Sequence, residues 1–168
     1  VTLTRLAHDE FLWVTSSASV VRDADWITRH VSADQQVSVT DVTGAFAVLG
    51  VMGPNARALL QSVSRADLSS DAFPFGSSRE IDLGTSTVRA TRITYVGELG
   101  WELYVPAEFA VSVFELLTSA GRDFGLVNAG YYAINCLRLE KGYRAFGPEL
   151  NPDYNPVEAG LMFAVKLK

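Results

Sequence analysis

Cysteine and histidine are both scarce in this sequence. Its 168 residues include one cysteine, Cys136, and two histidines, His8 and His30. One cysteine forms no disulfide within the chain, and the histidines lack the spacing of metal ligands, so we expect no metal site. Cys136 stands among apolar residues with no histidine near it in sequence. We therefore predict that it is a buried core residue rather than a nucleophile.

Long apolar runs and blocks of like charge are absent as well. No apolar stretch approaches the roughly 18 residues that cross a membrane. The net charge is −5 and the basic residues form no stripe, which is a poor match to nucleic acid. The sequence therefore predicts neither a membrane nor a nucleic-acid partner. It also lacks a P-loop, a dinucleotide-binding fingerprint and a Gly-x-Ser-x-Gly elbow.

Periodic patterns of apolar residues divide the chain into short elements. Helical spacing predicts helices over residues 20–30, 54–63, 109–124 and 129–141. Alternation or β-branched runs predict strands over residues 1–6, 11–15, 37–41, 45–52, 80–83, 88–94 and 101–105, and a strand-like pattern recurs over 163–168. Strand 45–52 is apolar throughout, which favours a central position in its sheet. Helix 129–141 is expected to pack four side chains inward, namely Tyr132, Cys136, Leu137 and Leu139.

These elements favour an α+β fold. The hairpins imply mixed, mainly antiparallel sheets, and the interleaved helices are expected to pack on one face. Strand–strand–helix passages occur twice, so a ferredoxin-like subdomain is the nearest simple topology.

The stretch from Tyr95 to Pro106 departs from an ordinary hairpin. It holds two glycines three residues apart, Gly97 and Gly100, whereas a tight hairpin turn needs two residues and one glycine. Tyr95 and Trp101 offer flat faces, and the two carboxylates in the same stretch offer hydrogen-bond acceptors. This set suits a flat heteroaromatic ligand that carries N–H donors. The alternative is a wide hairpin with solvated glutamates, Glu98 and Glu102.

A second polar cluster lies in residues 137–144, where Arg138, Lys141 and Arg144 occur within seven positions. Three cations this close indicate an anion-binding cluster. The alternative is a solvated helix end that carries an intrahelical ion pair. The residues alone leave both interpretations open.

In combination, these segments resemble a known family. The ordered set of residues 95–106, Asn128-Ala-Gly130, residues 137–144 and Pro156-Val-Glu-Ala-Gly160 resembles the folate-binding region of the sarcosine and dimethylglycine dehydrogenases. That region is similar to the glycine-cleavage T-protein, an aminomethyltransferase. The resemblance covers essentially the whole chain and implies a T-protein-like folate-binding fold. It further implies that residues 1–168 are a fragment without the flavin domain, the N-terminal part and the C-terminal β-barrel.

The resemblance assigns roles to individual residues. It implies that Tyr95 and Glu102 meet the pterin of tetrahydrofolate, and that Glu98 is structural or supports the site indirectly. Arg138 matches an arginine that binds a carboxylate of the substrate or of the folate tail, while a second family arginine falls on Ile134. The pocket asparagine of the T-protein falls on Ser16, and Val14 is expected to face the pterin. The essential aspartate of the T-protein aligns one position before Val1, so we expect no catalytic residue in this chain and no activity of the fragment alone.

The resemblance also implies a reaction. The parent protein is expected to oxidise an N-methylated glycine at FAD in another domain. Tetrahydrofolate would then accept the one-carbon unit to give 5,10-methylenetetrahydrofolate. A cytoplasmic location is expected, or the mitochondrial matrix in a eukaryote.

Three alternatives share the fold. They are a T-protein aminomethyltransferase, a regulatory module resembling that of pyruvate dehydrogenase phosphatase, and the folate-dependent iron–sulfur maintenance family. The last is disfavoured, because Tyr143 and Pro148 replace its signature cysteine and glutamine.

Overall fold

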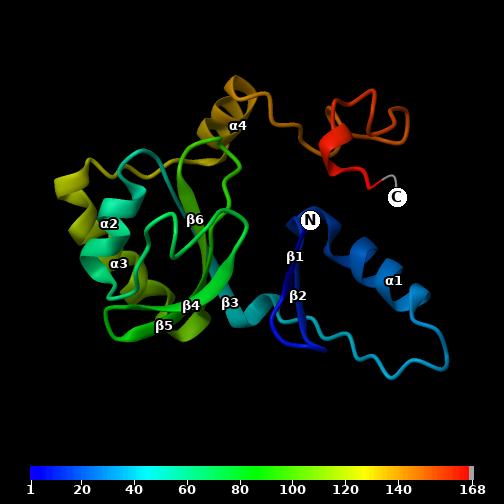
Figure 1. The fold of residues 1–168 in the computed structure, drawn as a ribbon, viewed down its shortest axis with the longest axis horizontal. Coiled ribbons are helices and arrows are strands. Elements are labelled where there is room, and N and C mark those ends of the chain that lie inside the picture. Colours follow the sequence, from blue (N-terminus) through cyan, green and yellow to red (C-terminus); the bar gives the residue numbers. More distant parts are fainter. Residues whose placement is uncertain (167–168) are drawn as a thin grey trace.

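The computed structural model describes residues 1–166 and divides into two lobes (Figure 1). The first lobe holds an antiparallel hairpin, β1 (Thr2–Arg5) and β2 (Phe11–Val14), and helix α1 (Val20–His30). The second lobe holds a four-stranded antiparallel sheet in the order β3-β6-β5-β4. Its strands are β3 (Phe46–Met52), β4 (Ser78–Leu83), β5 (Ser86–Thr91) and β6 (Gly100–Pro106). The remaining helices are α2 (Ala56–Val63), α3 (Ala110–Gly121) and α4 (Tyr131–Glu140).

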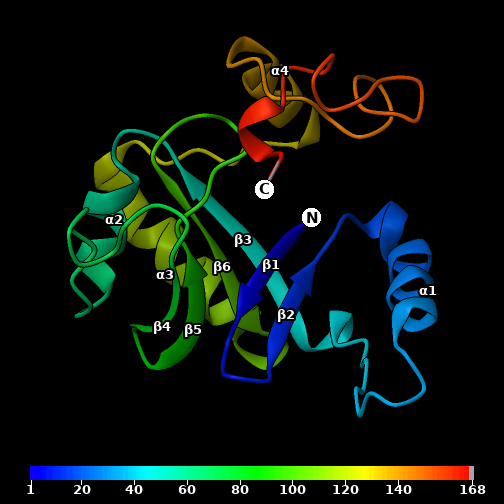
Figure 2. The ribbon, with the colours of Figure 1, turned by 45° about the vertical axis from the view of Figure 1, so that its right-hand side comes forward.

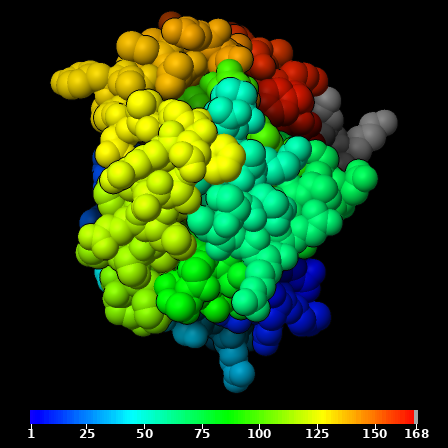
Figure 3. Space-filling model, turned by 90° about the vertical axis from the view of Figure 1, so that its left-hand side faces the viewer, coloured from blue at the N-terminus to red at the C-terminus, as the bar shows by residue number. Residues whose placement is uncertain are grey.

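The core lies between the four-stranded sheet and helices α2 and α3. Alternation along β6 sends Trp101, Leu103 and Val105 to the helix side, where none of them is exposed. Leu60 of α2 and Val113 of α3 meet them from the other layer. Figure 3 shows α2 and α3 side by side over this face. Because Trp101 is part of this core, it offers no flat face to a ligand, and that expectation was wrong.

The predicted α+β class is confirmed, with antiparallel sheets and two helices packed on one face of the larger sheet. As in a ferredoxin-like subdomain, two helices cover a four-stranded antiparallel sheet. The strand order differs, because β4, β5 and β6 follow one another as a meander and β3 pairs only with β6.

Strand β3 is an edge strand, not the central strand that its apolar sequence predicted. Val51 is buried towards α2 and α3, while Phe46 and Val48 point the other way and are exposed. The second apolar face of β3 borders the first lobe rather than another strand, which explains why both faces are apolar (Figure 2). The strand predicted over 37–41 does not form; these residues run extended and unpaired within the described chain.

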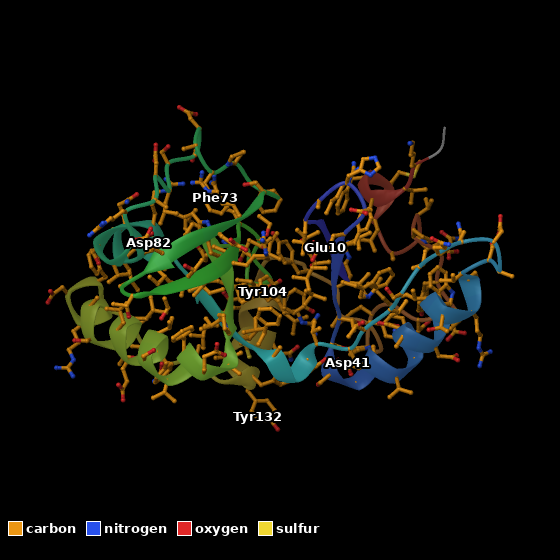
Figure 4. All side chains as sticks on the ribbon, turned by 90° about the horizontal axis from the view of Figure 1, so that it is seen from below. Glu10, Asp41, Phe73, Asp82, Tyr104 and Tyr132 are labelled. Carbon is orange, nitrogen blue, oxygen red and sulfur yellow. The ribbon has the colours of Figure 1, made fainter. Side chains whose placement is uncertain are left out.

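Helix α4 is also packed differently from the prediction. Tyr132 is 87% exposed and points away from the body of the molecule (Figure 4), and Cys136 is exposed. Leu137 and Leu139 are likewise exposed, and Arg138 is the buried residue of this helix. Helical spacing predicts a shared face, but it does not tell what covers that face. Cys136 is therefore not a core residue in this structure.

In the first lobe, the hairpin packs against α1, which forms over the predicted residues. Trp13 of β2 lies 6.5 Å from Trp26 of α1, and Trp26 stacks on His30 at 4.2 Å, both measured between ring centroids. The Thr15 hydroxyl donates to the Asp23 carboxylate, and this bond, with a second from Arg22, holds the pKa of Asp23 below its usual range.

The end of the described chain forms a short 3-10 turn at Met162–Ala164 rather than the predicted strand over 163–168. The last two positions of that predicted strand, 167 and 168, lie outside the described residues.

Candidate functional site

Glu102 lies in the middle of the larger sheet, on the face opposite α2 and α3. Its neighbours Trp101 and Leu103 point into the core, so alternation turns the Glu102 side chain towards the first lobe. Across the sheet it stands opposite Gly50 of β3 and Thr91 of β5. Glu102 is partly exposed. A carboxylate that is anchored in a rigid strand and open on one side is well placed to accept hydrogen bonds from a ligand.

Tyr104 holds the Glu102 carboxylate in place. The two residues are two positions apart on β6, hence on the same face, and the Tyr104 hydroxyl donates to Oε2 of Glu102 at 2.7 Å. Burial, followed by the effect of Glu102, raises the pKa of Tyr104 well above its usual range. The phenol therefore stays protonated and remains a donor at neutral pH. Oε1 of Glu102 accepts no hydrogen bond from the described residues 1–166.

The glycine-rich connection between β5 and β6 packs against the end of α4. Gly97 has a φ of +72°, and a Cβ built there would lie 2.4 Å from Cγ of Lys141. The Lys141 stem thus covers Gly97, and its ammonium group bonds Oε1 of Glu98 at 3.0 Å. This contact, with the ion pair, raises the pKa of Lys141. The ion pair ties Glu98 to the end of α4, and its indirect support of a binding site remains a prediction.

Tyr95 joins the same two segments. Its ring centroid lies 6.4 Å from that of Tyr143, and its hydroxyl reaches the carbonyl oxygen of Arg144 at 3.4 Å. Tyr95 is 38% exposed, so part of the ring faces solvent. The glycine-rich stretch and residues 137–144, which the sequence presents as two separate candidate sites, therefore form one neighbourhood.

Arg138 is almost fully buried, at 3% exposure, and it is the centre of a polar network. Its guanidinium group donates to Oδ1 of Asn135, to the carbonyl oxygen of Tyr143 at 3.0 Å and to Oε2 of Glu149 at 2.8 Å. The Ala145 N–H and then Arg138 lower the pKa of Glu149. The network fixes the loop after α4.

The three cations of the predicted anion cluster have separate partners. Arg138 bonds Glu149, Lys141 bonds Glu98, and Arg144 donates to the carbonyl oxygen of Gly142 at 2.9 Å. Their convergence on one anion remains a prediction.

A cavity of about 300 Å³ separates the two lobes. Val14 lines it from the hairpin and Val48 from β3, and Tyr104 contributes from the larger sheet. Figure 4 shows Tyr104 between that sheet and the hairpin. Tyr104 thus links the cavity to Glu102 through its hydrogen bond, although Glu102 is not itself a lining residue. Ser16 is exposed, does not line the cavity, and donates to Oγ of Ser19 at 3.1 Å.

Sequence reasoning missed two features of this site. The sequence alone could have placed Tyr104 beside Glu102, because it follows Glu102 by two positions and residues two apart in a strand share a face. The proximity of Gly50 has no local signal, because it depends on the pairing of β3 with β6. Within residues 1–166, no three metal-ligating side chains cluster, and none of the helices has the length and hydropathy needed to cross a membrane.

Residues 1–168 match the family described as GCVT N-terminal domain. Mitochondrial dimethylglycine dehydrogenase of Mus musculus is 44% identical over 168 residues, which cover 99% of this chain and 19% of that protein. Mitochondrial sarcosine dehydrogenase of Homo sapiens is 45% identical over 133 residues, covering 79% of this chain and 14% of that protein. An aminomethyltransferase of Halothermothrix orenii is 35% identical over 161 residues, covering 96% and 44% of the two chains.

The chain therefore spans about a fifth of the length of its dimethylglycine dehydrogenase relative. The match over all of its residues shows that it belongs to the GCVT N-terminal domain family.

Proposed function

We propose that this chain binds tetrahydrofolate, with the pterin on the Glu102 side of the larger sheet. The observation that carries the proposal is the Glu102 carboxylate, which is partly exposed and is anchored by Tyr104 through Oε2. The pterin ring of a folate presents amino and ring N–H groups. A fixed carboxylate is a suitable acceptor for such a group of donors, and charge strengthens each bond.

Other residues support the same ligand. Tyr95 offers a partly exposed ring beside Tyr143, and Val14 offers an apolar wall in the neighbouring cavity. The hydroxyl of Ser16, which lies outside the cavity lining and donates to Ser19, is proposed as a further hydrogen-bonding group at the end of the hairpin. Arg138 is proposed as a partner for a carboxylate of the substrate or the folate tail, which would share its guanidinium with Asn135, the Tyr143 carbonyl and Glu149.

We further propose that the whole protein is a flavin-dependent dehydrogenase of N-methylated glycines. When bound, tetrahydrofolate supplies the nitrogen atoms that accept a one-carbon unit as 5,10-methylenetetrahydrofolate. The residues of this chain hold and orient that acceptor, and orientation alone can account for much of a rate enhancement. FAD would belong to a part of the protein outside this chain. The names of two dehydrogenase relatives support the substrate class, and for a eukaryotic protein they also support the mitochondrial matrix.

The test is an anaerobic calorimetric titration of tetrahydrofolate into the wild-type protein and into Glu102→Ala. We expect saturable binding in the wild type and its loss in Glu102→Ala. Glu115→Ala is the matched control, because Glu115 lies exposed on α3, the helix layer opposite the Glu102 face. Equal binding by Glu102→Ala and the wild type would remove Glu102 from the site. No binding by the wild type would refute the folate proposal and favour the regulatory alternative.

A further inference from the structure

Gly50 lies inside β3, where glycine weakens a strand. Its register partner is Glu102, so both residues lie on the face that carries the proposed site. The neighbours of Gly50 on that face are Val48 and Met52, because residues two apart in a strand share a face. Gly50 is exposed and separates these two larger side chains. The result is a gap in the row of β3 side chains opposite Glu102, with Cε of Met52 at its edge.

The fold itself does not require a glycine at position 50. Its backbone is not in the left-handed region, and a Cβ built there would meet only Cε of Met52, at 3.4 Å, an ordinary contact with the end of a flexible side chain. Gly100, also in the sheet, is different: a Cβ there would lie 2.6 Å from Cγ of Met52 and 3.0 Å from a backbone oxygen. Packing therefore accounts for Gly100 but not for Gly50.

We propose that Gly50 determines ligand specificity by leaving room beside Glu102 for a flat heteroaromatic ring. This inference rests on the folate proposal and adds a steric condition to it. A ring that bonds the Glu102 carboxylate must lie close to the strand opposite, and any side chain at position 50 would stand in that space. The gap at Gly50 admits a planar pterin beside the backbone of β3.

The experiment compares tetrahydrofolate binding by four proteins, each in its full-length form and titrated anaerobically by calorimetry. They are the wild type, Gly50→Ala, Gly50→Val and the control Gly44→Ala. Gly44 precedes β3, and a Cβ there would meet nothing within 4 Å. Thermal unfolding of each protein reports on the fold. Because valine favours strands, we expect Gly50→Val to unfold at the same temperature as the wild type or higher.

We expect Gly50→Ala to lower the affinity about tenfold and Gly50→Val about 100-fold or more, as for overpacking of a filled site. Gly44→Ala should bind like the wild type. If the wild type binds, Glu102→Ala does not, and Gly50→Val binds normally, the role of Gly50 is refuted while the folate proposal stands. If the wild type does not bind tetrahydrofolate, the folate proposal and the role of Gly50 are both refuted. If Gly50→Val unfolds at a lower temperature than the wild type, Gly50→Ala decides, and a folded Gly50→Ala that binds like the wild type refutes the steric explanation.

Discussion

Replacing Gly97 by alanine should detach the glycine-rich connection from α4. Two costs apply at this position. The first is the left-handed backbone, with a φ of +72°, which costs an L-residue about 1–2 kcal/mol. The second is the Lys141 stem, because the new Cβ would lie 2.4 Å from its Cγ and 2.8 Å from its Cβ. Atoms so near the α4 backbone have little freedom to move, and overpacking of this kind costs about 1–3 kcal/mol. We expect a total loss of about 2–5 kcal/mol in the free energy of unfolding.

Gly125→Ala is a matched control for this change. Gly125 also has a φ of +72°, but a Cβ there would meet nothing within 4 Å. It should therefore lose only the backbone contribution, about 1–2 kcal/mol. For a domain of this size, the difference between the two variants corresponds to about 2–12 °C in the unfolding temperature.

Urea and thermal unfolding of both variants measure the difference. A third protein, with both Gly97→Ala and Lys141→Ala, should recover part of the overpacking cost of about 1–3 kcal/mol relative to the sum of the single changes, because Cγ and Cδ of Lys141 are gone while its Cβ remains. The Lys141–Glu98 ion pair is exposed and adds little to stability, so its loss does not obscure the result. Equal destabilisation by Gly97→Ala and Gly125→Ala, with no recovery in the double variant, would refute the packing argument.

Three further predictions concern single side chains. Tyr104→Phe should lower tetrahydrofolate affinity about tenfold in calorimetry, because Glu102 loses the donor that orients it. The prediction is wrong if Glu102→Ala abolishes binding while Tyr104→Phe binds like the wild type. Glu149 has a lowered pKa, so its contribution to stability is present above its unfolded pKa of 4.5 and is lost as pH falls through the folded value. Glu149→Gln should therefore flatten the decline of unfolding temperature below about pH 4.5. Parallel curves of unfolding temperature against pH for the two proteins would contradict this. Cys136 should react with a maleimide in the native chain without denaturant, and protection until unfolding would show that its thiol is covered.

The sequence predicts the elements better than it predicts their neighbours. Helix α1 forms over the predicted residues 20–30, since its start and its apolar spacing are local properties. The errors at β3 and α4 have another origin. An apolar face indicates that something covers it, but the pattern is the same whether that cover is a strand, another lobe or a ligand. For β3 the cover is the first lobe across a cavity, which periodicity along one strand cannot reveal.

In the candidate site too, local patterns in the sequence are predictable and tertiary contacts are not. Glu102 is identifiable from its place in the glycine-rich motif, and strand alternation then fixes its face. The partners that give it a defined geometry come from farther away. Gly50 meets Glu102 only through the register of β3 on β6, and Lys141 reaches Gly97 only after α4 has docked. These contacts depend on tertiary packing and carry no signal within a short window of sequence.

The separation of the two sheets has a consequence for the dynamics of the chain. Strands β1 and β2 bond only each other within the described residues, and no ladder connects them to β3. Opening the hairpin therefore breaks no hydrogen bond of the larger sheet, and an isolated two-stranded hairpin is marginal on its own. Amide protons of β2 should thus exchange with deuterated solvent through a local opening of low free energy, whereas those of β6 should exchange only through global unfolding. The lobe that carries Val14 would then act as a movable wall of the cavity, and a ligand held between the lobes would slow exchange in β2 far more than in β6.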